Sequence, residues 1–212
     1  MSSPPGRPTP APRFPAHAPP AQPPAAHPPS PHAPPALCAD PEGPIPPSLG
    51  VLGWAYVAGV ARPVEARPGG TAVARDRGSA IVVCGPTRLR RAAALERWYR
   101  RAARTRLGDL LATEAARLGV RPARLTIRAQ RTRWGSCSTS GTVSLNWRLL
   151  LAPVAVARYV VVHELCHLRV PNHSRAFWEA LEQALPEWRA GHRWLRRHEA
   201  QLLRYRTIDS VP

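Results

Sequence analysis

The sequence of 212 residues contains no apolar run long enough to cross a bilayer. Residues 49–61 come nearest, but this stretch of about 13 residues contains glycines, and a spanning helix needs about 20 apolar residues. The N-terminus also lacks the basic segment followed by an apolar segment that is typical of a secretory signal. We therefore expect a soluble, cytoplasmic protein with no membrane partner.

Lysine is absent as well, so all 30 basic residues are arginine and the formal net charge is +17. A charge of this size favours nucleic acid as a partner. No RNA- or DNA-binding motif accompanies it, however, and an arginine-rich sequence without lysine is typical of G+C-rich coding. We favour coding bias, and keep weak nucleic-acid contact through the arginine-rich residues 88–118 as the alternative.

Paired cysteines are missing too, because the four cysteines, at positions 38, 84, 137 and 166, form no C-x-x-C motif. This spacing argues against a structural zinc knuckle, and the expected reducing compartment argues against a disulfide framework.

Proline is abundant in one place only, since most of the 27 prolines lie within residues 1–47. Such a composition cannot bury a core and favours extended, disordered chain. We predict a disordered tail over residues 1–48 and a single domain over residues 49–205.

A metal-binding pattern lies in the C-terminal half, where His163 and His167 flank Glu164 in an H-E-x-x-H motif. Histidines four residues apart on a helix lie on one face, about 5–6 Å apart at Cβ, so both can bind one ion. The glutamate lies beside that ion, where it can act as a general base. The flanking residues are apolar, and a buried His-Glu-His set needs a metal or other partners to offset its desolvation. The pattern predicts a zinc site.

A catalytic zinc site takes three protein ligands and leaves one position for water. His173 follows His167 by six residues, and Pro171 between them ends the helix, so a turn can bring His173 back over the other two histidines. Glu179 or Glu182, on the next helix, is the alternative third ligand.

Several motifs together resemble the YgjP-like zinc metallopeptidase family, which is related to the WLM and SprT families. They are residues 159–168, 172–174, 177–178, 133–138 and 145–149. The resemblance covers about residues 80–200, with the core motifs in residues 125–185. It implies an α+β, zincin-like metallopeptidase fold, with a small sheet packed on the H-E-x-x-H helix. It also implies Zn²⁺ as cofactor, His163, His167 and His173 as its ligands, and Glu164 as the catalytic base.

The pattern of apolar residues predicts the secondary structure around these motifs. We expect strands at residues 54–57 and 80–83, a loop at 62–70, and a helix at 88–118 between caps at Thr87 and Gly119. The expected helix carries an apolar stripe at helical spacing, formed by Tyr99, Ala103, Leu107 and Leu111. Residues 125–130 and 141–147 are predicted to pair as a hairpin, with a turn at residues 138–141. Residues 134–137 lie at its bend, where they either pack as a turn with Trp134 in the core or line the cleft. Val143, Leu145 and Trp147 would face the core, and Ser144 and Asn146 the other side. Further helices are expected from Pro153, from residue 175 to 185 after a cap at Ser174, and from 190 to 205.

The function that these residues favour is zinc-dependent hydrolysis of a peptide or protein substrate, with an edge strand pairing with the extended peptide. Tyr159, His192 and Arg148 are the candidates for stabilising the oxyanion. One alternative is a zinc-containing binding protein associated with nucleic acid. Another is a zinc hydrolase that acts on a non-peptide substrate, such as a nucleotide.

Overall fold

The structure, a computed structural model, describes residues 52–212. The tail predicted for residues 1–48 lies outside this range. Within it, no helix combines the length and the apolar character that crossing a membrane requires.

Four short strands at the start of this range form one sheet, in the order β1-β2-β4-β3. They are β1 (Trp54–Val57), β2 (Val60–Arg67), β3 (Val73–Asp76) and β4 (Ile81–Cys84). β2 pairs antiparallel with β1 and parallel with β4, and β3 pairs antiparallel with β4. The loop predicted over residues 62–70 is therefore wrong, because most of it belongs to β2. Pro63 and the charged residues of β2 suggested a loop, but pairing on both sides of the strand outweighs that weak local preference.

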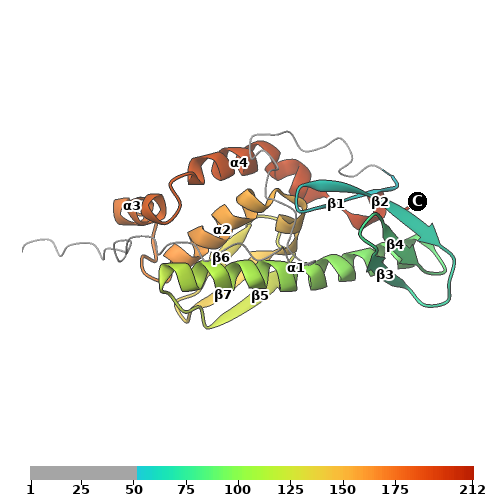
Figure 1. The fold of residues 1–212 in the computed structure, drawn as a ribbon, viewed down its shortest axis with the longest axis horizontal. Helices are drawn as coiled ribbons and strands as arrows, with labels where there is room; N and C mark the ends of the chain where they lie inside the picture. Colours follow the sequence, from blue (N-terminus) through green and yellow to red (C-terminus); the bar gives the residue numbers. More distant parts are fainter. Residues whose placement is uncertain (1–51) are drawn as a thin grey trace, which may run out of the picture.

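One helix of 31 residues, α1 (Arg88–Leu118), runs from this sheet along the rest of the molecule (Figure 1). As predicted, the Thr87 side chain caps its start by accepting from the Arg90 N–H, and Gly119 ends it with φ of 63°. The predicted apolar stripe is buried; it consists of Tyr99, Ala103, Leu107 and Leu111. The helix therefore supplies the core that both halves of the molecule share.

A second sheet has the order β5-β7-β6, from β5 (Arg124–Arg128), β6 (Gly135–Cys137) and β7 (Thr142–Asn146). β6 pairs antiparallel with β7, whereas β5 pairs with β7 in parallel. The predicted hairpin between residues 125–130 and 141–147 is therefore wrong. The turn predicted before β7 does exist, but it joins β7 to β6, and residues 135–137 form that strand rather than a bend.

Asn146 explains how β5 and β6 come to lie on either side of β7. Its Nδ2 donates to the carbonyl oxygens of Gln130 (2.7 Å) and Arg133 (3.1 Å), so it fixes the loop that crosses the end of β7. Asn146 is accordingly buried, with 1% of its surface exposed, because this loop covers it. Val143, Leu145 and Trp147 are buried as predicted.

Three helices complete the fold: α2 (Val154–Cys166), α3 (Arg175–Ala184) and α4 (Trp188–Arg204). α2 contacts β6 and β7, α1, α3 and α4, so it lies at the centre of this half (Figure 1). The predicted α+β fold, with a small sheet packed on the H-E-x-x-H helix, is confirmed. Pro153 and Ser174 occupy the caps of α2 and α3 without a side-chain capping bond. Two short 3-10 helices, η1 (Trp147–Leu151) and η2 (Thr207–Asp209), flank these elements.

Candidate active site

The last turn of α2 carries His163 and Glu164, and His167 caps the helix end. The rings of His163 and His167 lie 5.0 Å apart, centroid to centroid, as expected for residues one turn apart. A tight turn follows the helix, in which the N–H groups of Arg169 and Val170 both donate to the carbonyl of Cys166. This turn before Pro171 allows the following residues to return over the helix.

His173 returns to the other two histidines by this route. Its Nε2 lies 3.0 Å from Nε2 of His163, and its ring centroid lies 4.6 Å from that of His167. One ligand nitrogen from each of the three histidines lies within 4.8 Å of the others, so the three could hold one metal ion. We refer to His163, His167 and His173 as the histidine triad.

The alternative third ligands do not join the triad. Glu179 accepts a 2.7 Å hydrogen bond from Arg175 Nε, and Glu182 accepts one of 2.6 Å from Trp188 Nε1. Both carboxylates are thus engaged along α3 and at the start of α4. Among the described residues, the histidine triad is the group with metal-binding geometry.

Hydrogen bonding and burial prepare the triad for a cation. Nδ1 of His167 lies 3.1 Å from the Val170 carbonyl oxygen, which can only accept, so Nδ1 carries the proton and Nε2 keeps its lone pair. Burial, followed by the neighbouring histidines, lowers the pKa of His163 to about 3. Burial also lowers the pKa of His167. Both rings are therefore neutral at pH 7, which is the state that binds metal.

Glu164 is buried beside the triad, with 5% of its surface exposed, and its Oε2 has no hydrogen-bond partner in the structure. Burial raises the pKa of its carboxyl group to about 8. An uncompensated carboxylate in such a place is costly, and the shift marks a group that a nearby cation or a proton would stabilise.

The first residue of β6 explains how the sheet approaches this glutamate. A Cβ atom built at Gly135 would lie 2.7 Å from Glu164 Cγ, so only glycine allows the strand to lie this close. Cys137, at the end of β6, has its thiol pKa raised by burial and then by Glu164. Sequence reasoning left open whether residues 134–137 pack or line the site. The structure shows both: Trp134 is buried and donates to Glu199 (3.2 Å), while Gly135 contacts Glu164.

One of the three candidates for oxyanion stabilisation, Tyr159, adjoins the triad, and a second, His192, lies next to Tyr159. The Tyr159 ring lies 5.9 Å from that of His163 and 5.9 Å from that of His192. Burial, and then Glu164, raises the pKa of Tyr159 to about 12, so its hydroxyl keeps its proton at pH 7. Arg148 is engaged elsewhere, since its guanidinium donates to the Tyr205 carbonyl and lies over the Trp147 ring.

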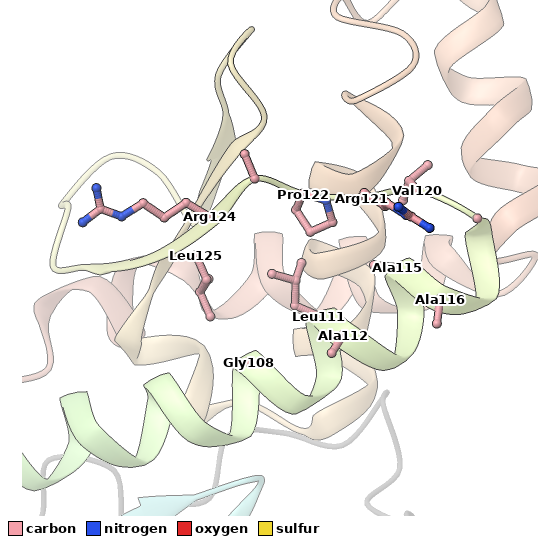
Figure 2. Close-up of a pocket in the computed structure, with 12 residues that line it drawn as sticks. Gly108, Leu111, Ala112, Ala115, Ala116, Val120, Arg121, Pro122, Arg124 and Leu125 are labelled. Atoms are coloured by element: carbon pink, nitrogen blue, oxygen red, sulfur yellow. The ribbon is translucent and has the colours of Figure 1, made fainter.

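A separate groove of about 870 Å³ lies between the second half of α1 and the chain leading into β5 (Figure 2). Leu111 and Leu125 lie between the helix and the strand, and small residues form much of the remaining wall. Its lining contains no carboxylate, histidine or cysteine. It therefore lacks the groups that hydrolysis requires, and the triad is the better candidate for the active site.

Comparison with known proteins identifies the class of protein. The protein is a metallopeptidase, and hence a hydrolase. The sequence model of the YgjP-like metallopeptidase domain matches residues 54–198, and the chain belongs to that family. This match begins earlier than the predicted resemblance and includes the first sheet.

Among solved structures, the chain is similar to the crystal structure of the metallopeptidase zymogen of Pyrococcus abyssi abylysin. The two are 28% identical over 47% of this chain and 98% of that chain, with a TM-score of 0.40. No curated protein matches the sequence.

Proposed function

We propose that the protein hydrolyses peptide bonds with a zinc ion held by His163, His167 and His173, and with Glu164 as the general base. One observation carries the proposal: three imidazole nitrogens converge beside a buried carboxylate that has an unpartnered oxygen. Family membership supplies the reaction class, and these residues are the groups that can perform it.

The triad fits zinc by the chemistry of its donors. Three neutral imidazoles form a ligand set that zinc enzymes use, and they leave a position open for water. The hydrogen bond from His167 Nδ1 to the Val170 carbonyl oxygen would fix the orientation of the imidazole, as is usual for histidines that bind zinc. When bound, zinc would polarise the scissile carbonyl and lower the pKa of water toward about 7.

Glu164 would accept a proton from the attacking water and pass it to the leaving amine. Its unpartnered Oε2 is the atom available for this transfer. Tyr159 and His192 are the two candidate donors to the developing oxyanion, because Tyr159 adjoins the triad and His192 lies next to Tyr159.

The free edge of β6 is the proposed place for the peptide backbone. In the order β5-β7-β6, this strand pairs with β7 on one side, which leaves its other edge available for strand addition. Because Gly135 touches Glu164, a peptide paired with β6 would pass directly by the base.

The nucleic-acid alternative rests on the arginines of α1, and several of these have structural partners. Arg88 donates to the carbonyls of Ile208 and Val211, Arg91 to that of Gly85, and Arg97 to that of Ala72. Part of the basic charge therefore stabilises the fold. A cytoplasmic location and the boundaries of the domain and its tail stay predictions.

A metal-replacement experiment tests this function. The full chain is stripped of metal with a chelator, reloaded with one equivalent of zinc, and incubated with a peptide library that is read by mass spectrometry. We expect peptide cleavage only after reloading. Cleavage of nucleotides but not peptides would favour the non-peptide hydrolase. Nucleic-acid binding with a steep salt dependence, and no hydrolysis, would favour the binding protein.

A further inference from the structure

A row of aromatic side chains continues from the histidine triad onto α3 and α4. The ring centroid of Trp178 lies 5.7 Å from that of His173 and 6.3 Å from that of His163. Trp188 stacks on Trp178, with centroids 5.2 Å apart and ring planes inclined by 29°. We call these two residues, Trp178 and Trp188, the aromatic wall.

Three further contacts hold Trp188 in place. Its Nε1 donates a 2.6 Å hydrogen bond to Oε2 of Glu182, and the Arg189 guanidinium lies 4.9 Å from its ring centroid. The Tyr159 ring stacks on it at 6.2 Å with an inclination of 23°. The polar group of the indole is thus satisfied and its orientation is fixed, so little conformational entropy remains to be lost when a ligand binds.

The aromatic wall packs against the core without being buried in it. α3 buries Phe177 and Leu181, and α4 buries Trp194 and Leu195, whereas both wall residues keep part of their surface exposed. Rigid, partly exposed aromatic rings beside a few convergent polar groups are the usual composition of a ligand subsite.

We propose that the aromatic wall is the subsite for a large apolar or aromatic side chain next to the scissile bond of the peptide. This inference rests on the proposed function, because the triad defines where the scissile bond would lie. The 6.3 Å between Trp178 and His163 is within the reach of one side chain. Successive side chains of an extended peptide point to opposite sides, so one residue beside the bond faces the wall while the next points away.

Selectivity between two matched peptides tests the subsite. The peptides are identical except for Phe or Ser at the residue next to the bond that the library identifies. We expect the zinc-loaded protein to prefer the Phe peptide by at least about tenfold in kcat/KM, as is typical of an apolar subsite. Trp178→Ala and Trp188→Ala should each reduce that ratio severalfold, while Trp188→Phe should keep most of it. The ratio is internal to each preparation, so partial unfolding of a variant does not affect it.

Trp54→Ala is the matched control, because Trp54 is an exposed tryptophan in the first sheet, with 41% of its surface accessible. This substitution should leave the ratio unchanged. The proposed subsite is wrong if the wild-type protein cleaves the two peptides with nearly equal kcat/KM. It is also wrong if Trp178→Ala and Trp188→Ala both keep the wild-type ratio.

Dissociation constants of the two peptides provide a second readout. They are measured with the Glu164→Gln protein and with the same protein carrying Trp178→Ala as well. If the zinc-loaded protein cleaves no peptide of the library, the proposed function fails, and the matched peptides then carry Phe or Ser in one arbitrary sequence. Equal dissociation constants for the two peptides would then overturn the subsite, whereas tighter binding of the Phe peptide that requires Trp178 would support it.

Discussion

Two glutamates are buried to almost the same degree in this molecule, yet their surroundings differ. Glu114, on α1, is 4% exposed and Glu164, on α2, is 5% exposed. Arg158 Nε lies 2.6 Å from one oxygen of Glu114, and Arg117 Nε lies 2.7 Å from the other. Glu164 has no arginine partner of this kind, and its Oε2 accepts no hydrogen bond.

The difference separates a carboxylate that stabilises the fold from the one that we propose as the base. The two arginines tie Glu114 to the neighbouring helices, because Arg117 also donates to the Ala184 carbonyl and Arg158 also pairs with Glu187. Because Glu164 is buried without such partners, its negative charge is unfavourable unless a cation binds nearby or a proton neutralises it. The unsatisfied group is the one to test for function, and the satisfied group is its natural control.

The largest expected effect is the loss of hydrolysis in Glu164→Gln. The amide has nearly the same size but cannot accept the proton of the attacking water, so the general-base contribution of about 10²–10⁴-fold should disappear. Zinc should stay bound, because the proposed ligands are the histidines. Cleavage rate and zinc content are measured on one preparation, with Glu114→Gln as the control that keeps activity per folded molecule. Full activity in Glu164→Gln would refute the mechanism.

Removal of a single histidine of the triad should have the next largest effect. His163→Ala, His167→Ala and His173→Ala should each weaken zinc binding by more than the roughly 10–100-fold typical of losing an outer hydrogen-bond partner. Competition with a chromophoric chelator measures the affinity. Glu179→Ala and Glu182→Ala are the controls. If His173→Ala retains zinc and one of these two controls loses it, the assignment of the third ligand is wrong.

Glu114→Gln should have the opposite effect to Glu164→Gln, because it should lower the stability of the fold and leave hydrolysis intact. We expect a loss of about 2 kcal/mol in the free energy of unfolding, less than the 3–5 kcal/mol of a fully buried pair. The reason is that the Arg117 and Arg158 side chains remain 38% and 34% exposed, so water can solvate them. Urea denaturation measures this loss. Unchanged stability would mean that the ion pairs contribute nothing.

The smallest effect concerns the pH dependence of stability in the metal-free protein. The pKa of Glu164 is raised from 4.5 to about 8, so its contribution to stability is full below pH 4.5 and is lost as the pH rises through 8. The pKa of His163 is lowered from 6.5 to about 3, so its contribution is full above pH 6.5 and is lost as the pH falls toward 3. The two contributions oppose each other between pH 4.5 and 6.5, which makes the net change small there.

Comparison with Glu164→Gln separates these two contributions. Denaturation of the metal-free proteins should show that the wild type loses stability relative to the variant as the pH rises from 6.5 to 8. A constant difference over that range would mean that the folded protein has already lost the Glu164 proton by pH 6.5, so that its pKa is not raised to about 8.

Local patterns in the sequence were enough to predict much of this arrangement. The spacing of Tyr99, Ala103, Leu107 and Leu111 identified α1, and the turn at Pro171 indicated how His173 reaches the triad. In these cases the signal and the structure lie within a few helical turns of each other.

Features that depend on distant segments could not be predicted in the same way. The parallel pairing of β5 with β7 requires a loop to cross the end of β7, and the sequence of a strand does not state which neighbour it will have. Trp188 lies 25 residues from His163 along the chain, and it is linked to the triad through the rings of Tyr159 and Trp178. Gly135 was visible only as part of a motif, and its contact with Glu164 required knowledge of where β6 packs.

The contact between Gly135 and Glu164 also constrains how such a sequence can diverge. Any side chain at position 135 would have to displace either the strand or the glutamate, because a Cβ there would lie 2.7 Å from Glu164 Cγ. Descendants that keep the glutamate are therefore expected to keep the glycine, whereas a descendant that lost the glutamate could accept other residues at both positions. The pair should change together over evolutionary time, although 29 positions separate its members in the chain.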